Sequence, residues 1–145
     1  MIMDTGSTMA DIISEKPFMV KPNRDELAQF TGFPILSRED VEKGLLLLHE
    51  AGVAVPLVTL DKDGACCYYN GEFYHFTSPR RQVVSAVGSG DSTVAGIATG
   101  LCRGMSLPDA VRLGMAAGAA NTQFPQTGMV SAALVQQFYA QIRRC

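Results

Sequence analysis

The stretch that decides the fold is VVSAVGSGDSTVAG, residues 83–96. Its apolar start predicts a strand, its Gly-Ser-Gly a tight turn, and the small residues after Asp91 a closely packed helix. Such a turn points several backbone N–H groups at one spot, and the positive end of the helix dipole adds to their potential. The stretch therefore predicts an anion site with a carboxylate beside it, an arrangement suited to proton transfer.

The composition is that of a globular protein. The chain has 145 residues, of which 47% are hydrophobic and 18% charged, with a net charge of −2. This length predicts a single domain over residues 1–145. The densest basic features are the pairs Arg80-Arg81 and Arg143-Arg144, so no nucleic-acid partner is expected. No apolar run approaches the roughly 18 residues of a membrane span, and no secretory signal is seen, which predicts a cytoplasmic protein without a membrane partner.

The cysteines do not follow a metal-binding pattern. Cys66, Cys67, Cys102 and Cys145 form no C-x-x-C pair and no Cys/His cluster. Cys66 and Cys67 lie in an apolar, strand-like run, where neighbouring side chains point to opposite faces. We expect them to be buried thiols in a reducing compartment, and no metal site is predicted at the cysteines.

Along the chain, predicted strands alternate with predicted helices. This order predicts an α/β sheet with helices on both faces. A hairpin with Asn70-Gly71 at its turn interrupts the alternation. Because the chain opens within an apparent strand, we expect upstream sequence to be missing. The strands are expected at residues 1–3, 18–20, 53–60, 65–69, 72–76 and 83–87, and the helices at 8–14, 23–31, 37–51, 91–102, 107–121 and 132–143.

Two further segments follow predicted strands, as the Gly-Ser-Gly-Asp turn does. Residues 21–26, KPNRDE, place a cation, an amide and carboxylates at a helix start, where Asn23 and Glu26 have capping-box spacing. Residues 59–65, TLDKDGA, turn sharply into the hairpin. Taken singly, the first is also explained as a capped surface helix, the second as an ordinary turn, and Asp91 as a favourable charge at a helix start. Together they lie where ligands bind open α/β sheets, beyond the carboxyl ends of the strands.

In these three motifs the chain resembles the PfkB-type carbohydrate kinases of the ribokinase-like superfamily. Residues 87–96 are similar to the C-terminal signature of that family, residues 21–26 to its strand–helix segment, and residues 59–65 to its nucleotide-side turn. Residues 4–6 and 116–121 also fit. The resemblance implies a three-layer ribokinase-like sheet with helices on both faces. It covers only the C-terminal portion of such a kinase, so the N-terminal half, which carries most sugar contacts, is expected to be absent.

The resemblance also implies roles for individual residues. Asp91 would be the base that takes a proton from the acceptor hydroxyl, within an anion hole made by backbone N–H groups. Asn23 and Glu26 would organise Mg²⁺ and phosphates, largely through water. The implied anion hole comprises Gly88, Ser89, Gly90 and Asp91; the implied nucleotide contacts are Lys21, Asn23, Glu26, Thr59, Asp61, Gly64, Ala119 and Asn121; and the implied monovalent-cation loop contains Ser85 and Val87.

The activity implied is that of an ATP-dependent kinase with Mg²⁺, and with K⁺ at the monovalent-cation loop. The form Gly-Ser-Gly-Asp-Ser is most similar to the phosphosugar branch, the 1-phosphofructokinases and tagatose-6-phosphate kinases. Its substrates would be fructose 1-phosphate or tagatose 6-phosphate. The implied partners are therefore a sugar phosphate and a nucleotide, with a homodimer as the further expectation.

The chain departs from the family pattern at two of these positions. Asp61 stands where the family usually has glycine, and its carboxylate would repel nucleotide phosphates. Ser85 stands where Asp or Asn is common. Three alternatives stay open: a ribokinase-type kinase of an unphosphorylated sugar, a non-catalytic nucleotide-binding module, and an interaction domain that completes its sheet with another polypeptide.

Overall fold

The computed structural model describes residues 2–4, 9–79, 89–122 and 132–144. Within them, strands and helices alternate as the sequence predicts. The strand predicted at 83–87 lies outside the described residues. The chain forms two compact units, Met1–His75 and Phe76–Cys145.

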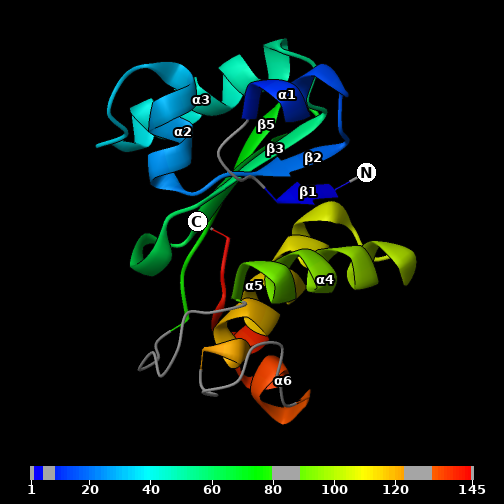
Figure 1. The fold of residues 1–145 in the computed structure, drawn as a ribbon. Coiled ribbons are helices and arrows are strands. Elements are labelled where there is room, and N and C mark those ends of the chain that lie inside the picture. The colour runs from blue at the N-terminus through cyan, green and yellow to red at the C-terminus, as the bar shows by residue number, and fades with distance from the viewer. Residues whose placement is uncertain (1, 5–8, 80–88, 123–131, 145) are drawn as a thin grey trace. The chain divides into compact units, whose positions relative to one another are not determined.

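The first unit is built on a mixed sheet, which within the described residues has the strand order β1-β2-β3-β4-β5 (Figure 1). Strands β1 (Ile2–Asp4), β2 (Met19–Lys21) and β3 (Val55–Thr59) are parallel, and Met19 is in register with Val55. Strand β3 is buried over its first four residues, as expected for an interior parallel strand of β-branched and apolar residues. It is two residues shorter at its start than the predicted strand at 53–60.

The predicted hairpin is confirmed with its predicted bounds. Strand β4 (Ala65–Tyr69) runs antiparallel to β3, and β5 (Glu72–Phe76) follows it in the sheet. Asn70 and Gly71 join the two strands with φ values of 54° and 81°. Two successive positive φ angles are the requirement of a type I′ turn, and Asn-Gly meets it best.

Helices α1 (Met9–Ser14), α2 (Arg24–Thr31) and α3 (Arg38–Glu50) lie on the same side of the strands (Figure 1). The contacts of α2 and α3 reach β3, and α3 also reaches β4. Each fully buried aliphatic side chain there contributes about 1.5–3 kcal/mol. The core between these helices and the sheet includes Val20, Leu27, Leu45, Leu48, Val58 and Cys66.

The start of α3 shows how these helices are fixed. Ser37 is the N-cap, and its hydroxyl accepts a hydrogen bond from the Asp40 N–H at 3.2 Å. The Asp40 carboxylate accepts in return from the backbone N–H groups of Leu36 at 3.0 Å and Ser37 at 3.1 Å. These bonds, that of Leu36 first, lower the pKa of Asp40. Ser37 and Asp40 thus form a capping box at the start of the helix expected at 37–51.

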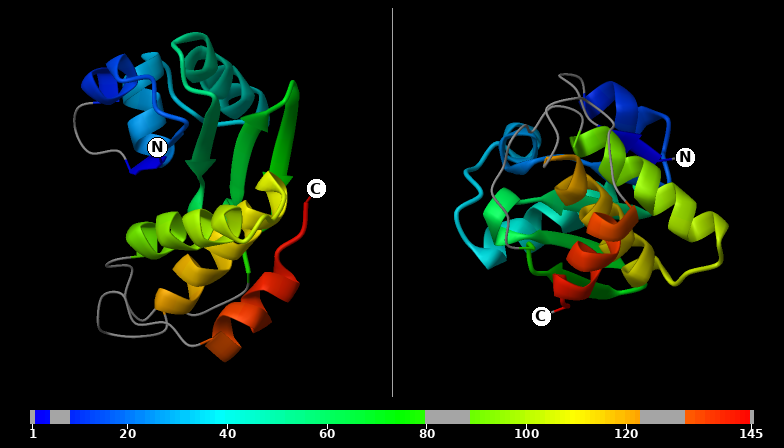
Figure 2. Two further views of the ribbon diagram at one scale, coloured as in Figure 1. Left: turned by 90° about the vertical axis from the view of Figure 1, so that its right-hand side faces the viewer. Right: turned by 90° about the horizontal axis from the view of Figure 1, so that it is seen from below.

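The second unit contains helices α4 (Ser89–Cys102), α5 (Leu107–Asn121) and α6 (Ala132–Gln141), with α5 in contact with both others (Figure 2). A Cβ atom on Gly96 would lie 2.7 Å from the Cα of Gly114, and one on Gly100 would lie 3.0 Å from the Cα of Ala110. Positions therefore rise along α4 as they fall along α5, which makes the pair antiparallel. The close packing predicted from the small residues is confirmed.

Arg112 of α5 holds the end of α6. Its guanidinium donates to the carbonyl of Tyr139 at 3.1 Å and to that of Ile142 at 3.0 Å, and lies 4.2 Å from the centre of the Tyr139 ring. A cation is favourable there because the last carbonyls of a helix lack partners within it. Helix α6 ends at Gln141 rather than at the predicted Arg143, whose carbonyl instead accepts from the Thr77 N–H at 2.8 Å.

We predict that Gly114→Ala destabilises the protein by about 1–3 kcal/mol, as overpacking of a close contact does. The added Cβ would lie 2.5 Å from the backbone oxygen of Thr93, which can move only with α4 itself. Urea unfolding measures the effect. Gly44→Ala in α3 is the matched control, because its Cβ would meet the side chain of Leu27 at 3.0 Å rather than backbone. A loss equal to that of the control would contradict the prediction.

Candidate functional site

The first candidate site lies at the carboxyl ends of β2 and β3. Because these strands are parallel, the segments that follow them leave the same edge of the sheet. Asn23 forms an isolated parallel bridge with Thr59, and the Thr59 N–H donates to the carbonyl of Pro22 at 3.0 Å. The structure therefore brings together the two segments predicted to contact a nucleotide in this unit.

Asn23 and Glu26 hold each other in a capping box at the start of α2. The side-chain oxygen of Asn23 accepts from the Glu26 N–H at 2.8 Å, and Oε1 of Glu26 accepts from the Asn23 N–H at 3.0 Å. This arrangement uses one of the two carboxylate oxygens of Glu26. A partly solvated carboxylate beside an amide fits Mg²⁺, which commonly keeps several waters and binds through one or two carboxylates plus phosphate oxygens.

Lys21 is nearly buried at the end of β2. Only 6% of the residue is exposed. Lysine is rarely buried to this degree unless it is paired. Lys21 is thus held in place next to the segment of Asn23, and is not a freely solvated surface charge.

The turn after β3 has a backbone that explains its sequence. Residues Asp61–Asp63 form a short 3₁₀ turn, closed by a bond from the Leu60 N–H to the Gly64 carbonyl at 2.8 Å. Gly64 has φ 89° and ψ −133°, a combination that is close to glycine-only. Asp61 has φ 50°, in the left-handed region that glycine enters freely and aspartate tolerates. The departure from glycine at Asp61 is therefore compatible with the turn.

A second candidate site lies in the other unit, at the start of α4. Gly90 and Asp91 occupy the first helical turn, and Asp91 is exposed. A carboxylate there is favoured by the helix dipole, and the unsatisfied N–H groups of that turn are the donors that an anion would use. Gly88, Ser85 and Val87 lie outside the described residues, so the predicted anion hole and monovalent-cation loop stay predictions.

The antiparallel pairing of α4 and α5 determines what lies near Asp91. Because Gly96 meets Gly114 and Ala117, the first turn of α4 lies alongside the last turn of α5. Ala119 and Asn121 belong to that last turn and are 3% and 0% exposed. Asp91 and the two residues predicted to lie near adenine are therefore at the same end of this helix pair.

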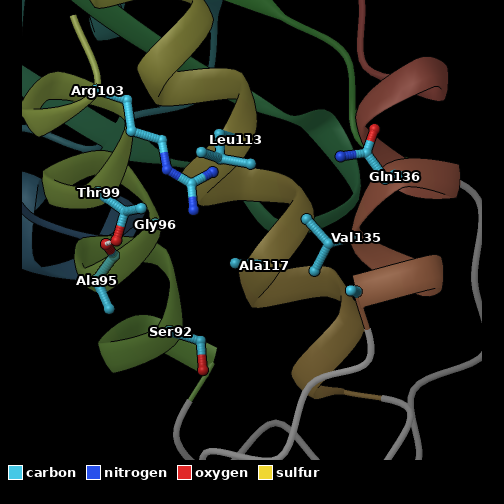
Figure 3. A pocket seen from close by; sticks show the side chains of 10 residues that line it. Ser92, Ala95, Gly96, Thr99, Arg103, Leu113, Ala117, Val135 and Gln136 are labelled. Atoms are coloured by element: carbon cyan, nitrogen blue, oxygen red, sulfur yellow. Dashed lines mark hydrogen bonds between the residues drawn. The ribbon is translucent and has the colours of Figure 1, made fainter. Parts of the chain in front are cut away.

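A separate cavity of about 400 Å³ lies among α4, α5 and α6 (Figure 3). Its walls are mostly apolar, with Ser92 towards one end and Arg103 towards the other. Leu113 and Ala117 line it from α5, and Ala117 lies two positions before Ala119. None of the residues predicted to bind nucleotide lines this cavity, so it is distinct from the candidate site.

Histidine and cysteine meet elsewhere in the first unit. Nε2 of His75 lies 2.9 Å from Oε1 of Glu42 and 3.6 Å from Sγ of Cys66. Burial, with smaller contributions from Cys67 and Glu42, raises the pKa of the Cys66 thiol. The thiol is therefore protonated and unsuited to nucleophilic catalysis. The prediction that Cys66 and Cys67 are buried thiols is confirmed.

The described residues contain neither a metal-binding cluster nor a membrane-spanning helix. No group of three or more His, Cys, Asp and Glu residues in them is placed to hold a metal ion. None of the helices described is both long and apolar enough to cross a membrane.

One contact in the candidate site was not anticipated. Nη2 of Arg24 lies 3.0 Å from Oδ2 of Asp63, so an ion pair joins the two segments predicted to contact a nucleotide. In the sequence, the only indication of this pair was the opposite charge of the two residues. It was weak, because 39 positions separate them in the chain.

Taken together, the fold and the candidate site define an α/β protein whose polar residues gather beyond the carboxyl ends of parallel strands and at one helix start, the places where phosphates bind. The model of the pfkB family of carbohydrate kinases matches residues 3–132. The chain belongs to the pfkB family of carbohydrate kinases.

Individual relatives agree with this assignment. The chain is 32% identical over 139 residues to 1-phosphofructokinase from Bacillus subtilis (strain 168), covering 96% of this chain and 45% of that protein. It is 32% identical over 152 residues to tagatose-6-phosphate kinase from Staphylococcus epidermidis, covering 97% and 47%. Phosphofructokinase-2 from Escherichia coli, solved in complex with potassium, matches with a TM-score of 0.86 and 29% identity, covering 97% and 46%. The predicted ribokinase-like α/β fold is confirmed, and the chain spans a little under half the length of these relatives.

We predict that substitutions at two positions of the turn after β3 affect stability to different extents. Gly64→Ala should destabilise the protein by about 1–3 kcal/mol, because alanine must adopt a backbone conformation that only glycine enters readily. Asp61→Gly should change stability by less than about 1 kcal/mol, because relief of the left-handed conformation offsets the larger entropy of unfolded glycine. Urea unfolding of both variants measures this, and equal losses would contradict it.

Proposed function

We propose that the native protein carrying this chain is an ATP-dependent kinase that phosphorylates a hydroxyl of a sugar phosphate, of the fructose 1-phosphate or tagatose 6-phosphate type. The observation that carries the proposal is the position of Asp91 in the first turn of α4, within a chain of the pfkB family. The names of the two relatives at 32% identity support the substrate class.

In this proposal Asp91 is the base. Its carboxylate accepts the proton of the acceptor hydroxyl, and the oxygen so freed attacks the γ-phosphorus of ATP. The bond from that phosphorus to the oxygen bridging to the β-phosphate breaks, and ADP leaves. Asp91 is exposed and lies at the start of α4, where a substrate hydroxyl can approach it.

The anion hole is the second component. Its donors would be backbone N–H groups of the first turn of α4, which includes Ser89, together with that of Gly88, the preceding residue. These groups would face the transferring phosphoryl group. Fixed donors at such a position contribute typically about 3–4 kcal/mol each, because they need no reorganisation as charge develops. Phosphoryl transfer requires mainly alignment and charge compensation, which a helix start supplies.

The nucleotide would lie along the carboxyl ends of β2 and β3. Lys21 and Asn23 would approach its phosphates, while the turn of Thr59, Asp61 and Gly64 would contact it through backbone. Mg²⁺, when bound, would compensate charge on the phosphate oxygens beside Glu26. We also propose K⁺ at Ser85 and Val87, since the Escherichia coli relative was solved with potassium.

A substrate screen tests the proposal as a whole. ADP formation by the native protein is measured with sugar phosphates and with the corresponding unphosphorylated sugars. Turnover with ketohexose phosphates is expected. Turnover only with an unphosphorylated sugar would indicate a ribokinase-type enzyme, and MgATP binding without turnover on any sugar would indicate a non-catalytic nucleotide-binding module.

We predict that Asp91→Asn lowers kcat of the native protein by at least about 10²-fold with little change in ATP affinity, because the amide cannot accept the proton. Steady-state kinetics and nucleotide titration measure the two quantities. Asp109→Asn, in the first turn of α5, is the matched control, since it removes an equivalent charge from a neighbouring helix start. Unchanged turnover in Asp91→Asn would refute the assignment of the base.

We predict that Glu26→Gln raises the Mg²⁺ concentration needed for half-maximal ATP binding by about tenfold or more, the usual effect of removing a group that organises a metal through water. Glutamine can keep the hydrogen bond from the Asn23 N–H, so α2 stays capped. Asp40→Asn removes the equivalent carboxylate from the capping box of α3 and should leave the Mg²⁺ requirement unchanged. Equal shifts in both variants would show a structural effect only.

A further inference from the structure

Charges from the two nucleotide segments meet at Arg24 and Asp63. Nη2 of Arg24 lies 3.0 Å from Oδ2 of Asp63, and Nη1 of Arg24 donates to the carbonyl of Ile35 at 2.9 Å. The guanidinium thus bridges the turn after β3 and the segment that leads into α3. The Ile35 end of this bridge is anchored, because Ile35 is 2% exposed and belongs to the core.

The place of Arg24 is not explained by the stability of its own helix. It is the first residue of α2, where the helix dipole favours negative charge, and Asp25 and Glu26 follow it. Arg38 begins α3 in the same way and donates from Nε to Nε2 of His75 at 3.0 Å, but its carboxylate partner, Glu42, lies four residues on in the same helix. Arg24 instead pairs with a residue of another segment.

The turn has reason to need such a contact. Its tip, Asp61–Asp63, is exposed, and Asp61 holds a left-handed backbone conformation that a non-glycine residue adopts at some cost. The hydrogen bonds of Leu60 and Gly64 close the base of the turn, whereas the Arg24–Asp63 pair fastens its tip. Without the pair, the tip could move relative to Asn23 and Glu26.

We propose that Arg24 and Asp63 are positioning residues for the nucleotide, a clasp that holds the turn after β3 against the start of α2. The clasp keeps the backbone of Gly64 at a fixed distance from the Asn23–Glu26 capping box, so that both contact one bound nucleotide. This inference rests on the proposed function for its ligand. Its geometry rests on the ion pair and the bond to Ile35 alone.

A positioning role and a purely electrostatic role predict different directions for the change in ATP affinity of the two single variants. If the charges acted directly on ATP, Arg24→Gln would weaken binding and Asp63→Asn would tighten it, because ATP is an anion. The clasp requires that both variants weaken binding, since each opens the same contact. It also requires that the double variant be no weaker than either single one, as in a coupled pair.

The test is a double-mutant cycle with three measurements. We expect the Kd and KM for MgATP to rise about two- to fivefold in Arg24→Gln, Asp63→Asn and the double variant, the range that an exposed ion pair supports, with kcat unchanged. Amide hydrogen exchange of Lys62, Asp63 and Gly64 without nucleotide should accelerate by a similar factor. Asp63→Glu should restore part of both effects. Arg38→Gln, the matched control at the start of α3, should change neither.

The possible results distinguish a failure of the clasp from a failure of the proposed function. Opposite signs for the two single variants, additive effects, or unchanged exchange in the turn would overturn the clasp while leaving the kinase proposal standing. Failure of the unaltered protein to bind MgATP would overturn the proposed function and the role of the clasp towards a nucleotide. The exchange measurement would then still decide whether the pair fastens the turn.

Discussion

The parallel pairing of β2 with β3 is the constraint on which the candidate site beyond their carboxyl ends depends. These strands are distant in sequence, with α2 and α3 between them, yet their carboxyl ends coincide because Met19 is in register with Val55. The bridge between Asn23 and Thr59 continues that register beyond the strands. A shift by one residue would turn the side chains of β2 to the opposite face and separate the two polar segments.

The capping box of α2 joins folding and ligand chemistry in the same atoms. Asn23 and Glu26 satisfy backbone N–H groups of the helix start, and the same two residues are proposed to organise Mg²⁺ and phosphate. The structural explanation of the segment KPNRDE, a capped helix, therefore does not compete with the functional one. It describes how the side chains are held before a ligand arrives, which lowers the entropy lost on binding.

Much of this could be predicted from the sequence, and the limits have physical causes. Asn70-Gly71 specifies its turn locally, and the helix from Leu107 to Asn121, which has its predicted bounds, carries local signals at its start, the N-cap Ser106 and Pro108 in the first turn. The carboxyl-edge placement of residues 21–26 and 59–65 followed from strand order alone. The Arg24–Asp63 pair could not be predicted, since it depends on how the segments meet in space. The backbone conformation of Asp61 was likewise invisible in the residue type, which many turns accommodate.

The contact between α4 and α5 has a consequence for conformational entropy. Glycine and alanine have no side-chain rotamers to lose on burial, and they meet at Gly96, Gly114 and Ala117, with the buried side chain of Ile97 beside Gly114. The ordering of this helix pair is thus largely a matter of backbone. Asp91 lies in a turn whose position depends on contact between main chains. Changes of side-chain rotamer in that interface therefore displace Asp91 little.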